Sequence, residues 1–287
     1  MKADKGKMSF ILSMVIFGSI GLFRRYIDMP SSFIACVRGV LGAVSILLLM
    51  FSVGQKPDIN EIKKSAVPLI VSGVFIGINW ILLFEAYNYT TVAAATLCYY
   101  MQPVIVVLLS APLLSEKLTA KKCLCVLAAL TGMFLVSGIL NDAGAGSDSV
   151  KGALLGLGAA VFYAFVVLIN KKWLTETKPM ETTVTQIFTA GAFLIPYVFS
   201  KGAISAVNFS VSGILMLIFV ALVHTGLAYW LFFKSVKKIP AQTAAILSYI
   251  DPVVAVLVSA VFLKEPLTPA GIAGAVLIIA AAFISEK

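Results

Sequence analysis

The charged or chargeable side chains of Arg38, Glu85, His224 and Asp251 lie inside long apolar stretches of this 287-residue chain. A carboxylate near the centre of a membrane-spanning helix costs about 2.5–3.5 kcal/mol on insertion scales, and such residues are functional candidates by default. Asp251 could bind a cationic group of a solute or carry a proton, and His224 can change its charge between about pH 5 and 8. The chemistry indicated is ion binding and proton transfer.

Each of these side chains also has a structural interpretation. Asp251 could cap a broken backbone or pair with a neighbour, and the lone His224 could be a neutral hydrogen-bonding residue between helices. Arg38 and Glu85 lie at similar depths in neighbouring segments, so we expect a buried ion pair with a structural or a gating role. The sequence leaves these alternatives open.

Asp251 stands directly before Pro252, and the pair Gln102–Pro103 occupies the equivalent place 149 residues earlier. A proline inside a helix donates no hydrogen bond and clashes with the carbonyl group four residues back. Within a membrane, a broken helix is tolerated only where it faces protein or a wet cavity. We expect helix breaks at Pro103 and Pro252 that border a solute cavity, with two simple kinks as the alternative.

Aromatic and polar side chains gather at the same depth as Asp251. A cavity walled by aromatic rings with one carboxylate suits an amine-bearing, partly apolar solute, through ring stacking and cation–π contact. The predicted solute-binding residues are Asp251, Tyr99, Gln102, Ser248, His224, Trp80, Asn79, Tyr249 and Tyr229. Of these, Tyr99, Gln102, Ser248 and Asp251 share equivalent helix faces. Tyr87, in contrast, fits the aromatic belt at a membrane surface.

The elements that position these residues are membrane-spanning helices. The chain is 60% hydrophobic and 12% charged with a mean hydropathy of +1.02, whereas a soluble domain has about 25% charged residues. A spanning helix needs roughly 20 apolar residues. Ten such segments are predicted, at about 8–26, 31–53, 65–87, 91–112, 121–140, 152–170, 181–200, 211–233, 241–263 and 267–284. The fold class expected is therefore an all-α membrane protein without a soluble domain.

The chain repeats itself at an offset of 149 residues, and ten of seventeen positions are identical between 103–119 and 252–268. Five helices per copy is an odd number, so the second copy must cross the membrane in the opposite sense. We expect two inverted-topology repeats of five helices, 1–140 and 151–287, joined by a Gly/Ser/Asp-rich linker at 141–150. This arrangement is typical of secondary transporters, whose site lies near the midplane at the repeat interface.

Lysine and arginine residues are distributed unequally between the two predicted membrane faces. With a cytoplasmic N-terminus, the cytoplasmic side carries sixteen and the opposite side five. Such an excess in short loops sets orientation, so both termini of this multi-pass protein of the cell membrane are predicted to be cytoplasmic. The formal net charge of +9 is thus a sign of topology and does not indicate nucleic acid as a partner.

Two E-x-L-T motifs, Glu116 to Thr119 and Glu265 to Thr268, follow the two proline-containing segments. We interpret them as turn and capping groups, because the same geometry recurs at opposite membrane faces where the solute cannot be.

These motifs resemble the drug/metabolite transporter (DMT) superfamily, specifically its ten-helix EamA-domain exporters. The matching features are Phe17-Gly18-Ser19, Arg38, the run 93–97 that leads to Pro103, and the doubled P…E-x-L-T block. The resemblance implies a secondary carrier that moves amino acid-like, amine-bearing or drug-like metabolites outward by alternating access. Alternatives are an uptake carrier for a quaternary-amine or other cationic solute, and a flippase for lipid-linked substrates.

No motif of an enzyme or of an ATP-driven pump is visible, such as H-E-x-x-H, G-x-S-x-G or a P-loop lysine. We predict no enzymatic activity, no cofactor and no metal site. The expected partners are a small-molecule solute, membrane lipid and protons as a coupling ion.

Overall fold

The computed structural model describes residues 2–24, 26–90, 92–136, 149–262, 264 and 268–286. Most of the predicted linker and the capping candidate Glu265 lie outside these ranges. The described elements are the helices α1 (Lys2–Arg24), α2 (Ser31–Ser52), α3 (Ile59–Lys64), α4 (Ala66–Ala86), α5 (Val92–Tyr99), α6 (Gln102–Leu114), α7 (Ala120–Val136), α8 (Ser149–Lys172), α9 (Pro179–Ser200), α10 (Val211–Phe219), the π-helix η2 (Val220–Leu227), α11 (Ala228–Val236), α12 (Ala241–Ser248), α13 (Ile250–Phe262) and α14 (Pro269–Glu286).

These helices form ten membrane-crossing segments, which confirms the predicted all-α fold class. Within the described ranges, eight spans are long and apolar enough to cross a membrane by the combined criteria of length and hydropathy. The shorter helices α7 and α14 supply the fifth and tenth segments. The fourth and ninth segments are each built from two helices, α5 with α6 and α12 with α13, while α10, η2 and α11 run on as one segment.

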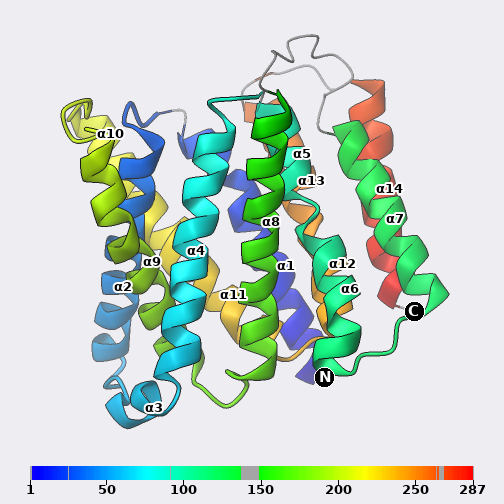
Figure 1. The fold of residues 1–287 in the computed structure, drawn as a ribbon, viewed down its shortest axis with the longest axis horizontal. Helices are drawn as coiled ribbons and strands as arrows, with labels where there is room; N and C mark the ends of the chain where they lie inside the picture. The colour runs from blue at the N-terminus through cyan, green and yellow to red at the C-terminus, as the bar shows by residue number, and fades with distance from the viewer. Residues whose placement is uncertain are drawn as a thin grey trace.

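The packing of the helices follows the repeat. The helices α1–α7 correspond to α8–α14, and α2 packs on its counterpart α9 as α7 packs on α14. The helix α8 packs on α4 and α6. In the same way its counterpart α1 packs on α11 and α13, which are the counterparts of α4 and α6. Figure 1 shows the N- and C-termini at the same end of the bundle. We call this the termini end and the opposite one the far end.

Glycines permit close backbone approach where the repeats cross. A Cβ atom added to Gly39 of α2 would lie 2.8 Å from the Cα atom of Gly191 in α9. In the α7–α14 pair, a Cβ atom on Gly132 would lie 2.7 Å from the carbonyl oxygen of Gly274. Helices in lipid associate through dispersion contacts between small residues, so these crossings hold the two halves together at short range.

Both proline-containing segments are broken in the structure just before their prolines. The helix α5 ends at Tyr99 and α6 begins at Gln102, while α12 ends at Ser248 and α13 begins at Ile250. The phenol of Tyr249, in the second break, donates a hydrogen bond of 2.9 Å to the carbonyl oxygen of Tyr100 in the first. The two breaks are thus adjacent, and a backbone acceptor freed in one repeat is satisfied from the other, as a low-dielectric environment requires.

Residues of the first E-x-L-T motif form hydrogen bonds with the starts of two different helices. The hydroxyl of Thr119 accepts a hydrogen bond from the Lys122 amide at the start of α7, and Thr268 does the same for Gly271 at the start of α14. Glu116 does not cap the helix that follows it. Its carboxylate instead accepts hydrogen bonds from the backbone amides of the first residues of α12, in the other repeat.

Candidate functional site

A cavity of about 530 Å³ lies between the two repeats. Its walls come from α1, α2, α4, the two broken segments, α8, η2 and α11. Aromatic and aliphatic side chains form most of its surface, which is usual for small-molecule sites. The predicted site residues among its lining are Asp251, Tyr99, Gln102, Ser248, Trp80, Asn79, Tyr229 and Arg38.

Many lining residues are counterparts under the repeat. The offset of 149 relates Trp80 to Tyr229 and Tyr99 to Ser248, and both members of each pair face the cavity. Further such pairs in the lining are Gln102 with Asp251, Leu83 with Phe232 and Met14 with Tyr163. The cavity therefore lies on the pseudo-twofold axis, as expected for a site at a repeat interface.

Asp251 occupies the first turn of α13, directly after the second helix break. The phenol of Tyr100 interacts with its carboxyl group. Helix α1 passes closely behind, because a Cβ atom on Gly18 would meet the Asp251 carbonyl oxygen and lie 2.8 Å from the Cβ atom of Val254. Gly18, the centre of the Phe-Gly-Ser motif, is required for this approach.

Arg38 reaches the cavity from α2. Its guanidinium carbon lies 4.7 Å from the centre of the Trp80 ring, in a cation–π contact. The Nε atom of Arg38 is buried and has no hydrogen-bond partner within the described part of the chain.

The predicted Arg38–Glu85 pair is not formed among the residues that the structure describes. Glu85 pairs with Lys201 at 2.7 Å, accepts a hydrogen bond from the Tyr197 hydroxyl, and accepts a further one from the Asn88 amide. The two residues were expected to meet because their depths are similar, but depth alone does not fix the direction in which a side chain leaves its helix. Glu85 points to α9 at the far end.

His224 lies at the centre of the π-helix η2 and outside the cavity lining. Its Nε2 atom is 3.0 Å from the hydroxyl of Ser19 in α1, and its ring packs on Phe23 and Phe219. Within the described residues, its buried Nδ1 atom has no hydrogen-bond partner. His224 therefore connects η2, whose Val220 lines the cavity, to α1 without lining the cavity itself. Single π-helical turns in α-helices are frequent at functional sites.

Two other predicted site residues have structural contacts. Tyr249 is fully buried, lies outside the lining and bridges the two helix breaks. Asn79 does line the cavity, but its amide nitrogen donates to the Ala159 carbonyl oxygen at 2.7 Å and thereby ties α4 to α8.

The structure adds lining residues that were not among the predicted set, notably Tyr163, Tyr100 and Tyr87. The repeat offset did not indicate Tyr163, because its counterpart Met14 is an apolar residue that was not among the predicted site residues. Tyr87 was assigned to the aromatic belt, whereas it lies in the cavity wall near Thr96.

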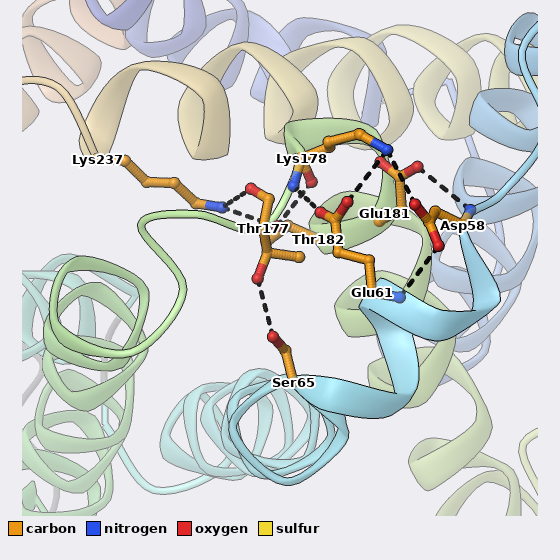
Figure 2. A network of polar contacts seen from close by, with 8 residues as sticks. All are labelled: Asp58, Glu61, Ser65, Thr177, Lys178, Glu181, Thr182 and Lys237. Atoms are coloured by element: carbon orange, nitrogen blue, oxygen red, sulfur yellow. Dashed lines mark hydrogen bonds and ion pairs between the residues drawn. The ribbon is translucent and has the colours of Figure 1, made fainter.

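The cavity reaches toward the far end, because its lining includes Arg24, Ile27 and Ser31 from the end of α1 and the connection to α2. Toward the termini end the two repeats are joined by the polar network in Figure 2. Lys178 pairs there with Asp58 at 3.2 Å and with Glu61 at 3.1 Å.

A second part of this network is centred on Lys237, at the end of α11. Its ammonium group donates hydrogen bonds of 2.8 Å to the Thr177 carbonyl oxygen and the Thr182 hydroxyl (Figure 2). Burial lowers the pKa of Lys237 to about 8, although nearby Glu61 and Glu181 act in the opposite direction. Together with the bonds of Glu116 to α12, these contacts close the termini end.

Comparisons with known proteins agree with the two-repeat arrangement. An uncharacterized transporter of Bacillus subtilis, YxxF, is 29% identical over 89% of this chain and 81% of its own length. The uncharacterized inner membrane transporter YicL of Salmonella typhimurium is 25% identical over 98% of this chain and 94% of its own. A crystal structure with 17% sequence identity superposes with a TM-score of 0.85 over 98% of this chain and 96% of that one, which shows the shared fold.

The family assignment follows from a match to both halves. The family model described as the EamA-like transporter family matches residues 4–138 and again residues 150–286. Together the two matches cover nearly the whole chain, and each falls on one of the two repeats. The chain belongs to the EamA-like transporter family.

Proposed function

We propose that this protein is a secondary transporter that exports small amine-bearing organic metabolites across the cytoplasmic membrane by alternating access. The observation that carries the proposal is Asp251, a carboxylate at a helix break in an aromatic-rich cavity between inverted repeats. A carboxylate there attracts a cationic nitrogen, and the rings of Tyr99 and Tyr229 add cation–π contacts. Outward transport is the direction that the resemblance to exporters implies.

The cavity and the closed termini end support an alternating-access cycle. With both termini cytoplasmic, as the lysine and arginine distribution favours, this structure corresponds to a state whose cavity reaches the outer side. Release of the solute into the cytoplasm or its loading from there would require the termini-end network to open. A proton carried by Asp251 is the proposed coupling ion, since the same carboxyl group could exchange a proton for the amine.

The test compares Asp251→Asn with the unchanged protein. Metabolite profiles of a deletion strain and an overexpressing strain first identify the exported solute, and its flux is then measured in proteoliposomes. Asparagine keeps the shape and hydrogen-bonding capacity of aspartate, so the variant isolates the charge. We expect flux to fall at least tenfold while the melting temperature is unchanged or higher, because burial of a carboxylate in a membrane costs about 2.5–3.5 kcal/mol.

The matched control is Glu176→Gln, which removes an exposed carboxylate outside the cavity. It should leave flux and melting temperature unchanged. If Asp251→Asn kept its flux per folded molecule, or lost stability instead, Asp251 would be a structural acid and the proposed site would be wrong.

A further inference from the structure

A second pocket, of about 530 Å³, lies at the termini end and shares no lining residue with the solute cavity. Its walls are the α6–α7 connection and the start of α7 from the first repeat, and the end of α8 and the α11–α12 connection from the second. The charged residues of its lining are Lys117, Lys122, Lys171, Lys237, Lys238 and Glu116. Five positive charges therefore face one negative charge, and we call this the basic pocket.

Two of the five ammonium groups are already used by the protein. The side chain of Lys171 is only 9% exposed, and its ammonium group donates to a backbone carbonyl at the end of α11 and lies 3.9 Å from Glu116. The ammonium group of Lys237 is held by Thr177 and Thr182. Glu116 itself accepts hydrogen bonds from the first amides of α12. The single carboxylate of the pocket is thus already engaged.

The other three lysines keep free ammonium groups. Those of Lys117, Lys122 and Lys238 form no hydrogen bond or ion pair with any residue that the structure describes. The first two belong to the first repeat and Lys238 to the second, so free cations face one pocket from both repeats. Because like charges repel one another at short range, an anion that lies among them would stabilise this arrangement.

The fold does not require these lysines. Their repeat counterparts are Pro266, Gly271 and Tyr89. The glutamate of the motif, in contrast, is retained as Glu265. A lysine excess at one membrane face sets orientation, but orientation does not require lysines of both repeats to converge on one pocket. Their convergence is explained by a ligand.

We propose that the basic pocket binds a phosphate group, and that the bound anion links the two repeats at the termini end. Phosphate oxygens accept several charge-assisted hydrogen bonds, and lysine binds them as a point charge. Basic pockets between membrane helices are typical sites for the headgroups of acidic lipids. The site is separate from the solute cavity, so the inference goes beyond the proposed function and does not depend on which solute is carried.

The surroundings of the pocket favour a lipid headgroup over a soluble phosphate as the source of this group. Leu118, in the α6–α7 connection, is 41% exposed, and Leu124, in the first turns of α7, is 66% exposed. Exposed leucines at the start of a membrane-crossing helix face lipid, so acyl chains can lie against them while the headgroup enters the pocket. A soluble phosphate shares the headgroup chemistry but gains nothing from this apolar surface.

A competition experiment tests the site and the source. Phosphatidylglycerol with a fluorescent acyl chain is bound to the full chain in a neutral detergent and followed by fluorescence anisotropy. The competitors are unlabelled phosphatidylglycerol, phosphatidylcholine, whose phosphate is neutralised by its own choline group, and inorganic phosphate. We expect phosphatidylglycerol to displace the probe at concentrations about tenfold lower than either of the others, because its headgroup carries a net charge and its chains reach the leucines.

Two triple variants remove the same charge at the same end of the bundle. The pocket variant combines Lys117→Gln, Lys122→Gln and Lys238→Gln. The control combines Lys63→Gln, Lys64→Gln and Lys121→Gln, which are exposed and outside the pocket. Each lysine near an acidic lipid contributes about fivefold in affinity, so the pocket variant should lose roughly tenfold or more and the control much less. If the pocket variant does not fold, a loss of about fivefold in Lys238→Gln alone serves in its place.

The link between the repeats is tested by access from the termini end. Ser110 is buried, and the Gln242 amide that donates to its hydroxyl also donates to the Lys117 carbonyl oxygen. Maleimide labelling of Ser110→Cys, in a background without native cysteines, is measured in nanodiscs. Labelling should slow severalfold when phosphatidylglycerol replaces part of the phosphatidylcholine, and the pocket variant should remove this effect.

Equal displacement by all three competitors, or equal losses in the two triple variants, would overturn the phosphate site and leave the lysines as signals of topology. Displacement by inorganic phosphate as strong as that by phosphatidylglycerol would overturn the lipid source. Labelling that does not respond to phosphatidylglycerol would overturn the link between the repeats. None of these results bears on Asp251, so failure here is distinct from failure of the amine-transport proposal.

Discussion

The termini end and the far end of the bundle are equivalent under the repeat, yet they are held by different contacts. At the termini end, Lys178 bridges two carboxylates of the other repeat and the ammonium group of Lys237 is buried against Thr177. The far-end counterparts of Lys178 and Lys237 are Met29 and Asn88. The residues that correspond to these two lysines at the far end are therefore uncharged.

The far end has its own contacts between the repeats. Glu85 pairs there with Lys201 at 2.7 Å, and the lysine of this ion pair is half exposed. The exposed amide of Asn208 donates a hydrogen bond of 3.0 Å to the carboxylate of Asp28, the counterpart of Thr177. Exposed polar contacts of this kind contribute little, typically below about 1 kcal/mol. Because the two ends share one backbone plan, their difference comes from side chains. The termini end has more contacts between the repeats, through Lys178 and Glu116, and this favours the arrangement in which the termini end is closed and the cavity reaches the far end.

The largest effect is expected when the termini end is locked. The hydroxyl oxygens of Ser65 and Thr177 lie 3.1 Å apart across the two repeats, so the double variant Ser65→Cys with Thr177→Cys is placed to form a disulfide. Because the proposed carrier must open this end in every cycle, oxidation should abolish flux in proteoliposomes and a reductant should restore it.

The single variants under the same oxidant control for the native thiols Cys36, Cys98, Cys123 and Cys125, all of which are free in the structure. Flux that persists in fully crosslinked protein would show that the termini end does not open during transport.

A smaller effect is expected for Glu116→Gln, which keeps an acceptor for the amides of α12 but removes the charge. The wild-type carboxylate accepts from the Ala241 amide at 2.8 Å and lies 3.9 Å from the ammonium group of Lys171. Charge-assisted hydrogen bonds are about twice as strong as neutral ones, so closure of the termini end should lose about 1–2 kcal/mol.

The readout is maleimide labelling of Ser110→Cys, a buried position beside Gln242, in a background without native cysteines. A loss of about 1–2 kcal/mol corresponds to roughly 5–30-fold faster labelling. Glu176→Gln in the same background should leave the rate unchanged. Equal rates in the Glu116 and Glu176 variants would contradict the assigned role of Glu116.

The sequence was sufficient to predict the ten segments, the repeat and the region of the cavity, because hydrophobic length and prolines are local signals. It was not sufficient to assign partners to charges. Glu85 was paired with Arg38 on depth, but the ammonium group of Lys201, at the end of α9, lies closer. From the sequence, Lys237 was interpreted as a surface charge that marks topology. Only the fold shows that Thr177 and Thr182 surround it.

Lys237→Met should make a pH-dependent difference of comparable size. The pKa of Lys237 is about 8 in the closed arrangement, below its ordinary 10.5, so closing this end releases a proton in that window. Raising the pH from 8 to 10.5 therefore favours closure, and this gain is lost progressively as the pH falls from 10.5 to 8. Its size is at most on the order of 1–3 kcal/mol.

The melting temperature of the wild type, measured between pH 7 and 9.5, should thus rise relative to that of Lys237→Met. The control is Lys234→Met on the same helix, where the lysine lies over the Trp230 ring. This control should follow the wild type. Parallel curves for all three proteins would mean that Lys237 is not buried when the termini end is closed.

The smallest effect is expected at the far end, for Asn208→Ala. This variant removes the hydrogen bond to Asp28 but leaves every contact of the termini end in place. Because the bond is exposed, its loss should cost less than about 1 kcal/mol, and the labelling rate of Ser110→Cys should not change. If Asn208→Ala slowed that labelling or stopped transport, the far-end bond would have to contribute as much as the termini-end network. The difference between the two ends would then not explain which end is closed.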